Sequence, residues 1–265
     1  MKTFQHQLWG YEIDLPREWH HRKFGDKDGF ALDPDAFQPA YQGDYLAQLL
    51  IQGEWNSLNK SIRSLWNQHL GRTTLFLGAK KVGAAPWRMA GARGYEVEIA
   101  LPQKSRRRLW AGILEKGALV LEFAVLHWKD HRELMEPILS RMISSLRLIP
   151  RAEGVEITPE GLPLPAGTAE LPPGEVIDEI TDPKNWSAHS GEFSVGALQA
   201  FYIRELKAHS WSLLSYTPYP GQGNPPFARF KISKEQQQYT LGLLPDAPDQ
   251  GTAAVVLRKT RALTS

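Results

Sequence analysis

Two histidines four residues apart, in His127-Trp-Lys-Asp-His131, form the pattern in this chain that comes nearest to a metal site. On a helix, this spacing places both imidazoles on one face, as in many zinc sites. The glutamate that follows the first histidine in zinc proteases is replaced by Trp128, and no third ligand can be named. The pair also spans an expected strand end and helix start, where polar residues are common. We therefore expect no metal here, and the sequence predicts no cofactor.

Patterns for nucleophilic catalysis are missing from the sequence. It contains no Gly-x-Ser-x-Gly turn, and Ser61-Ile-Arg-Ser64 lies in an expected amphipathic helix instead of a sharp turn. The absence of cysteine excludes thiolate catalysis, disulfides and cysteine-based metal sites. Gly154 and Gly161 lie in a proline-rich stretch and open no helix, so they predict no phosphate-binding loop. These patterns favour a protein that performs no covalent chemistry.

The basic run Lys104-Ser-Arg-Arg-Arg108 is the strongest charged feature. One interpretation is a solvated hairpin edge whose charges prevent pairing with other strands. The other is a surface for an acidic partner, with Arg106, Arg107 and Arg108 as the candidate partner-binding residues. That partner could be a protein, a lipid headgroup or a nucleic acid, although the net charge of only +2 argues against nucleic acid.

A β-hairpin is expected at the centre of the first half. The apolar runs 108–114 and 118–126 are joined by Glu115-Lys-Gly117, which is typical of a hairpin turn. The second run is apolar on both faces except at Glu122, so it predicts a central strand with a layer on each side.

Two amphipathic helices are expected to provide these layers. The first is capped by Asn56 or Ser57 and ends at Gly71, before a predicted strand at residues 73–77. The second contains Pro137, which predicts either a kink or a start near Glu133. The apolar stripes are Leu58, Ile62, Leu65, Trp66 and His69 in the first helix, and Leu134, Met135, Ile138, Leu139, Met142, Ile143 and Leu146 in the second.

The length of 265 residues favours two domains, and 42% apolar with 23% charged residues is typical of a globular protein. Residues 150–174 contain six prolines and four glycines, which predicts an extended, semi-rigid linker between a domain at 1–149 and one at 175–265. In the second domain we expect a helix capped by Ser194 and a meander of strands, which together make a small α+β domain. The expected strands are 211–216, 227–232, 239–244 and 253–257.

The N-terminus lacks the apolar segment of a signal peptide, and no apolar run approaches the roughly 18 residues of a membrane span. We therefore expect no membrane span and a cytoplasmic location.

Residues 4–148 resemble the Mog1/PsbP-like superfamily. The resemblance rests on Gly10-Tyr11-x-Ile13-x-Leu15-Pro16-x-x-Trp19, the strand that begins Gly94-Tyr95, the hairpin, and the helix end Ser144-Ser145-Leu146. It implies an antiparallel sheet between helices, as an α/β/α sandwich. Its known relatives dock onto proteins, a small GTPase of nuclear transport in one branch and a photosystem complex in another, without covalent chemistry.

The second half is similar to a small domain of predicted bacterial envelope proteins and lipoproteins. The similarity rests on Leu162-Pro-Leu-Pro165, Phe201-Tyr202-x-x-x-Leu206 and Trp211. Leu164 stands where a tyrosine is usual, and Ser210 where a glycine is usual. No activity follows from this similarity.

Taken together, the sequence favours a non-catalytic accessory or partner-binding protein, with a protein as the expected partner. The alternative is a small-ligand-binding protein, or an enzyme of unknown reaction, that uses an aromatic-walled cleft between the two halves.

Overall fold

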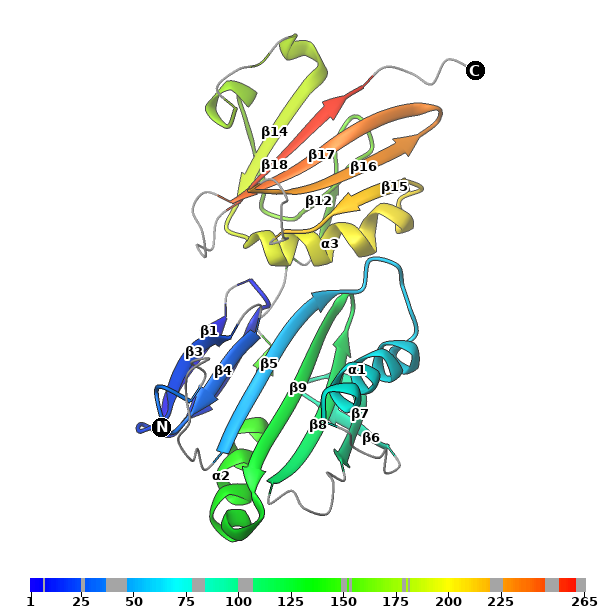
Figure 1. The fold of residues 1–265 in the computed structure, drawn as a ribbon. Coiled ribbons are helices and arrows are strands. Elements are labelled where there is room, and N and C mark those ends of the chain that lie inside the picture. Colours follow the sequence, from blue (N-terminus) through cyan, green and yellow to red (C-terminus); the bar gives the residue numbers. More distant parts are fainter. Residues whose placement is uncertain are drawn as a thin grey trace. The chain divides into compact units, whose positions relative to one another are not determined.

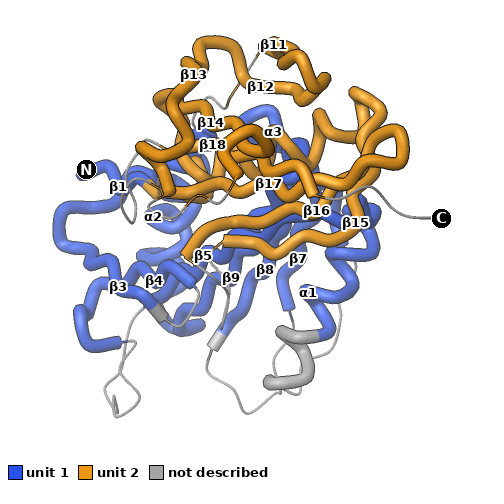
Figure 2. The backbone as a smooth tube through the Cα atoms, turned by 90° about the horizontal axis from the view of Figure 1, so that it is seen from above, with its two compact units in different colours: residues 1–5, 11–148 blue, residues 6–10, 149–265 orange. Residues whose placement is uncertain are grey.

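The computed structural model describes the chain except for residues 7, 25–26, 37–46, 78–83, 100–106, 149–151, 153, 178–179, 181, 220–225, 246–252 and 261–265. The side chains of residues 24, 72–77, 107 and 131 also lie outside the description. The chain forms two compact units (Figure 2). Unit 1 contains Met1–Gln5 and Tyr11–Leu148, and unit 2 contains His6–Gly10 and Ile149–Ser265.

Unit 1 is built on an antiparallel sheet that has seven strands in the described part of the chain (Figure 1). Its strand order is β3-β4-β5-β9-β8-β7-β6. The bounds are β3 His20–Phe24, β4 Lys27–Ala31, β5 Ala47–Trp55, β6 Ala85–Met89, β7 Ala92–Ile99, β8 Arg107–Lys116 and β9 Leu119–Trp128.

The predicted central hairpin is confirmed. It consists of β8 and β9, joined at Gly117, which has a φ of 60° that glycine adopts without strain. β9 lies between β5 and β8, and the side chains of Val120 and Phe123 are fully buried. A strand in this position needs apolar residues on both faces, which explains its composition.

Helix α1, Ile62–Leu77, covers one face of this sheet. Leu65, Trp66 and Leu70 pack there against alternate residues of β7, β8 and β9. The sequence placed the start of this helix too early, because Leu58 precedes it and is 76% exposed.

The predicted caps of α1 were also wrong. The Asn56 side chain closes the preceding turn by accepting a 2.8 Å hydrogen bond from the Lys60 amide. The Ser64 amide instead donates to the hydroxyl of Ser61, one residue before the helix. Gly71 lies inside the helix with no positive φ, and residues 73–77 continue it where a strand was expected.

Helix α2, Arg132–Ser144, covers the opposite face of the sheet. It follows a 3-10 turn, η1 Lys129–His131, so the predicted start near Glu133 is confirmed and Pro137 lies inside the helix. Met135, Leu139 and Met142 are buried. The sheet therefore lies between two helices, and the α/β/α sandwich is confirmed.

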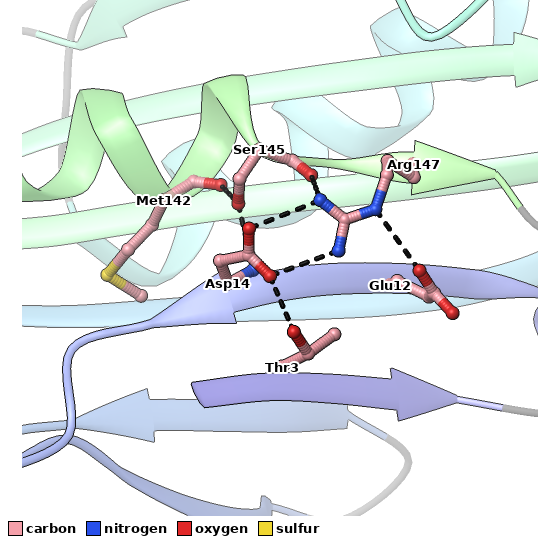
Figure 3. Close-up of polar contacts among 6 residues, drawn as sticks. All are labelled: Thr3, Glu12, Asp14, Met142, Ser145 and Arg147. Carbon is pink, nitrogen blue, oxygen red and sulfur yellow. Dashed lines mark hydrogen bonds and ion pairs between the residues drawn. The ribbon is translucent and has the colours of Figure 1, made fainter. Parts of the chain in front are cut away.

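A second sheet in unit 1 joins the beginning of the chain to the end of the unit. Its order is β1 Lys2–His6, β2 Tyr11–Leu15 and β10 Arg147–Leu148. Arg147 of β10 binds the carboxylates of two β2 residues, with Nε 3.1 Å from Glu12 Oε2 and Nη2 3.0 Å from Asp14 Oδ1 (Figure 3). The Asp14 carboxylate also accepts a hydrogen bond from Thr3 of β1, so one cluster links all three strands.

Unit 2 is an antiparallel sheet of six strands, in the described part of the chain, with helix α3, Val195–Ala208, packed on it. The predicted meander is confirmed as β15-β16-β17-β18, and β14 and β13 extend it beyond β18. The bounds are β13 Ala169–Leu171, β14 Trp186–Gly191, β15 Ser212–Thr217, β16 Ala228–Lys234, β17 Gln237–Pro245 and β18 Ala253–Lys259, with 3-10 turns η2 Pro173–Glu175 and η3 Pro183–Asn185.

The described residues of the predicted linker, 150–174, are part of unit 2 instead of an extended spacer. They contain a two-stranded ribbon of β11 Val155–Ile157 and β12 Pro163–Pro165. Leu162 and Leu164 are buried in the core of unit 2, and the Trp211 indole donates to the Gly161 carbonyl at 2.8 Å. Prolines are tolerated here because β12 pairs with β11 alone.

Helix α3 begins at the predicted cap, where the Ser194 hydroxyl accepts from the Ala197 amide at 3.1 Å. Its fully buried Gln199 holds the chain after β15, because it accepts from the Tyr216 hydroxyl at 2.6 Å and exchanges hydrogen bonds with the backbone of Tyr219. Among the described residues, no helix is both long and apolar enough to cross a membrane.

Candidate functional site

A pocket of about 340 Å³ lies within unit 1, between α2 and strands β6 to β9. We call it the α2 pocket. An aromatic-walled cleft between the two halves was the alternative considered from the sequence, whereas the residues that line this aromatic-walled pocket all belong to unit 1. Its apolar lining is Trp87, Met89, Leu109, Trp110, Val125, Leu139 and Ile143, and its ionisable lining is Glu96, Glu98, Arg108, His127 and Glu136.

Strand register brings these side chains together. Glu98 of β7 is opposite Trp110 of β8, which is in turn opposite Val125 of β9. Arg108 is opposite His127 in the same way. Residues directly opposite each other in an antiparallel sheet point to the same face, so both rows face α2.

Two tryptophans form the aromatic wall of the pocket. The rings of Trp87 and Trp110 meet edge to face, with centroids 5.3 Å apart at 85°, and Trp87 meets Phe123 in the same way at 5.2 Å. Gly112 provides the space for this arrangement. A Cβ at Gly112 would lie 2.6 Å from the Trp110 ring and 2.8 Å from the Trp87 ring, so any larger residue would displace the wall.

Each acidic residue of the pocket has a partner. Glu96 accepts a 3.1 Å hydrogen bond from the Trp110 indole, which fixes the orientation of that ring. Glu98 forms an ion pair with Arg108. Glu136 of α2 binds Arg132 at 2.8 Å, and its Oε1 lies 3.7 Å from His127 Nε2.

The residues predicted from the basic run fall at one edge of this pocket or outside the description. Arg108 lines the pocket and is bound to Glu98. Arg107 is the first residue of β8, and its side chain is not described. Arg106 lies outside the described residues.

The helical spacing proposed for the two histidines does not occur. His127 is a buried residue of strand β9, and its Nδ1 lies 3.0 Å from the Trp128 carbonyl. His131 is the last residue of η1, and its side chain lies outside the description. In the described part of the chain, no group of three or more His, Asp or Glu residues could hold a metal ion.

Sequence reasoning missed the aromatic wall. Trp87 lies in an edge strand that contains Pro86 and Arg88, so its apolar alternation is weak. The alternation of Glu96 and Glu98 with apolar residues was a usable signal, since it predicts one polar face on β7. The pocket presents an aromatic surface beside carboxylates that are held by hydrogen bonds and ion pairs.

No family model matches this chain, and no curated protein matches its sequence. PsbP from Synechocystis matches with a TM-score of 0.43 and 13% identity, over 56% of this chain and 91% of that one. The Saccharomyces cerevisiae Ran-binding protein Mog1p matches with a TM-score of 0.38 and 8% identity, over 56% and 95%. LpqN of Mycobacterium tuberculosis, involved in cell envelope biogenesis, matches with a TM-score of 0.42 and 12% identity, over 56% and 90%.

Structures of the PsbP/Mog1 kind match about 56% of the chain. Both branches that the sequence resemblance named are represented among them. At these identities the likeness concerns the fold of that part of the chain and assigns a role to no residue.

Proposed function

We propose that this chain is a non-catalytic accessory protein, that it binds a protein partner, and that a side chain of the partner inserts into the α2 pocket. The observation that carries this proposal is the preformed aromatic wall of Trp87 and Trp110, held by Glu96 and accommodated by Gly112. Rigid aromatic side chains at the edge of a cavity are typical anchors of protein interfaces.

The charges of the pocket favour a positively charged side chain with an apolar stem. Three carboxylates line it: Glu98 is paired with Arg108, Glu136 is paired with Arg132, and Glu96 accepts only from the neutral Trp110 indole among the described residues. The carboxylate of Glu96 is therefore the one that a positive charge would balance. A lysine or arginine side chain would place its stem along Trp110 and its charge near these carboxylates. Charge complementarity therefore selects a basic segment of the partner.

The basic run remains a second element of the proposal. Arg108 is bound to Glu98, so it supports the edge of the pocket. Arg106 and Arg107 would then be the residues that contact an acidic part of the same partner. A cytoplasmic location belongs to this proposal as well.

A small soluble ligand is the alternative occupant. The volume of about 340 Å³ is near the lower end of the range of roughly 300–1,000 Å³ found for small-molecule sites. In that case the ligand is expected to be an amine with an apolar body, for the same electrostatic reason.

Affinity capture with the full chain tests the proposal. The variant Ser140→Trp fills the pocket from α2, and Ser64→Trp places the same side chain on the exposed surface of α1 as a matched control. We expect wild type and Ser64→Trp to retain one specific protein that Ser140→Trp loses. Circular dichroism should show that both variants are folded.

Two results would contradict this function. Retention of the same partner by Ser140→Trp and by Trp110→Ala would remove the pocket from the interface. Unchanged partner binding by a triple variant in which Arg106, Arg107 and Arg108 are each replaced by Glu would show that the basic run does not belong to the interface. Capture of no protein, together with binding of an amine that Ser140→Trp abolishes, would instead establish the small-ligand alternative.

A further inference from the structure

Two arginines lie directly opposite each other at the edge of the seven-stranded sheet. Arg88 of β6 is paired with Arg93 of β7. Both follow the alternation that faces away from α2, because Arg88 is adjacent to Trp87 and Arg93 is three residues before Glu96. Like charges at directly opposed positions destabilise a sheet, so this pair is unfavourable for the fold itself.

The neighbouring carboxylate does not balance the pair. Arg93 Nη2 lies 3.8 Å from Glu115 Oε2, and the Arg93 side chain is 76% exposed. Glu115 also accepts a 3.1 Å hydrogen bond from the Asn56 side chain. Arg88 has no hydrogen bond or ion pair within the described ranges of the chain.

Two adjoining depressions, of about 450 and 860 Å³, surround this pair. Both are lined by Arg88, Arg93 and Glu115. Lys60 lines the first and Lys116 lines the second. Four basic side chains therefore surround one carboxylate in a concave part of unit 1.

The loop that carries Lys60 is held in place. The Asn56 side chain accepts from the Lys60 amide and donates to the Lys60 carbonyl, both at 2.8 Å, and the Asn56 amide donates to the Ala118 carbonyl at 2.8 Å. The turn between β6 and β7 is equally defined, with Ala90 at φ 50° and Gly91 at φ 73°. The basic groups are thus presented by fixed backbone.

We propose that this basic depression binds the phosphate group of a small soluble ligand. Opposed residues of an antiparallel pair have Cβ atoms about 4.5–5.5 Å apart, so both guanidinium groups can contact one tetrahedral anion. Each guanidinium matches two phosphate oxygens, and Lys60 adds a third positive charge. Binding would turn an unfavourable pair into a stabilising one. The side chains of Arg88 and Arg93 face away from α2, and the inference does not rest on the function proposed for the α2 pocket.

Calorimetric titration of the full chain with inorganic phosphate and with pyrophosphate tests this inference. We expect both to bind, pyrophosphate more tightly, and we expect Arg88→Gln and Arg93→Gln each to weaken binding at least about tenfold. Arg17→Gln, on an exposed turn of unit 1, is the matched control and should bind like wild type.

Thermal unfolding separates a binding role from a structural one. In chloride, Arg88→Gln should unfold at a temperature equal to or above that of wild type, because the repulsion is removed. In phosphate at the same ionic strength, wild type should gain stability and Arg88→Gln should not. A variant that loses stability equally in both salts would overturn the proposal.

Two binding results would also overturn it. One is pyrophosphate binding that survives in the double variant Arg88→Gln, Arg93→Gln. The other is the absence of any phosphate or pyrophosphate binding at millimolar concentration while polyglutamate binds and is displaced by the same variants. The second result would reassign the depression to an acidic protein.

Discussion

The hydroxyl of Tyr11 lies 2.5 Å from Oδ2 of Asp28, and this hydrogen bond joins two different sheets of unit 1. Tyr11 belongs to β2 of the three-stranded sheet, and Asp28 belongs to β4 of the seven-stranded sheet. The Asp28 carboxylate, only 1% exposed, also lies 2.8 Å from His21 Nε2 and 3.1 Å from Lys23 Nζ. One buried carboxylate of β4 thus holds groups from two other strands, β2 and β3.

Tyr11→Phe should lower the free energy of unfolding by about 1–3 kcal/mol, because it removes a hydrogen bond to a buried charged group. Urea denaturation measures this change. Tyr95→Phe is the control, since Tyr95 stacks on Trp66 through its ring and should change stability by less than about 0.5 kcal/mol. Equal effects of the two substitutions would show that the hydrogen bond between the two sheets does not contribute to the free energy of unfolding.

Stability should fall as the pH rises above about 10. Burial, and then the neighbouring Asp28 charge, raise the pKa of Tyr11, and burial raises the pKa of Tyr202 and Tyr216. In the unfolded chain these tyrosines ionise near pH 10, while the folded chain keeps their protons. Their contribution to the stability of the folded state is therefore complete below pH 10 and is lost at higher pH. Denaturation at a series of alkaline pH values measures the slope. Tyr202→Phe should reduce the slope of stability against pH. An unchanged slope in this variant would contradict the role of the buried tyrosines in the alkaline loss of stability.

Removing one member of the buried pair of His69 and Glu122 should lower the free energy of unfolding strongly, whereas replacing both members by apolar residues should change it little. His69 Nδ1 of α1 lies 3.1 Å from Glu122 Oε2 of β9, with side-chain exposures of 8% and 5%. His69→Leu alone should destabilise unit 1 by about 3 kcal/mol, because it removes a partner of a buried carboxylate. The double variant His69→Leu, Glu122→Leu should recover most of this loss. A double variant as unstable as the sum of the two single ones would contradict coupling between these residues.

The cluster around Arg147 should protect unit 1 against acid. Hydrogen bonds from Arg147, and then from Thr3, lower the pKa of Asp14 below its ordinary value. A lowered pKa gives stability that is present above the unfolded value near 4 and is lost as the pH falls through the folded value. Arg147→Ala should raise the pKa of Asp14 in an NMR titration and reduce the acid-dependent part of the stability. Asp14 titrating identically in both proteins would exclude this role.

Gly112→Ala should disturb the α2 pocket. The added methyl group would overlap both rings of the aromatic wall, and overpacking of this kind costs about 1–3 kcal/mol. Gly71→Ala is the matched control, because nothing lies near a Cβ at that helical position, and it should stabilise the protein by about 0.5–1 kcal/mol. Near-ultraviolet circular dichroism would report the displaced tryptophans in the first variant only.

The sequence predicted the centre of unit 1 because that region is determined by local patterns. A strand buried on both faces shows a continuous apolar run, and the stripe of α2 shows the helical period. The meander of unit 2 was predicted for the same reason.

The errors arose where one local signal fits two structures. Gly71 resembles a helix end, but its φ is not positive, and the helix continues to Leu77. The prolines of 150–174 favour an extended chain equally in a linker and in the ribbon formed by β11 and β12. Leu58 continues the spacing of the α1 stripe but belongs to a turn fixed by the Asn56 side chain.

The candidate site was only partly predictable. Arg108 and His127 were selected from the sequence, since charged clusters and histidine pairs are visible in it. Trp110 and Glu98 become neighbours through strand register, which depends on pairings between distant residues. The opposition of Arg88 and Arg93 arises in the same way, from a short hairpin at the sheet edge that the alternation pattern did not identify.

The loop at His6–Gly10 belongs to unit 2, where the Leu8 carbonyl lies so close to Gly196 of α3 that a Cβ there would be 1.7 Å from its oxygen. The chain consequently passes from one unit to the other three times, after residues 5, 10 and 148. A single cut, by a protease or by a cloning boundary, cannot separate the two units intact. A C-terminal fragment that starts at residue 149 would lose the segment that lies against the start of α3.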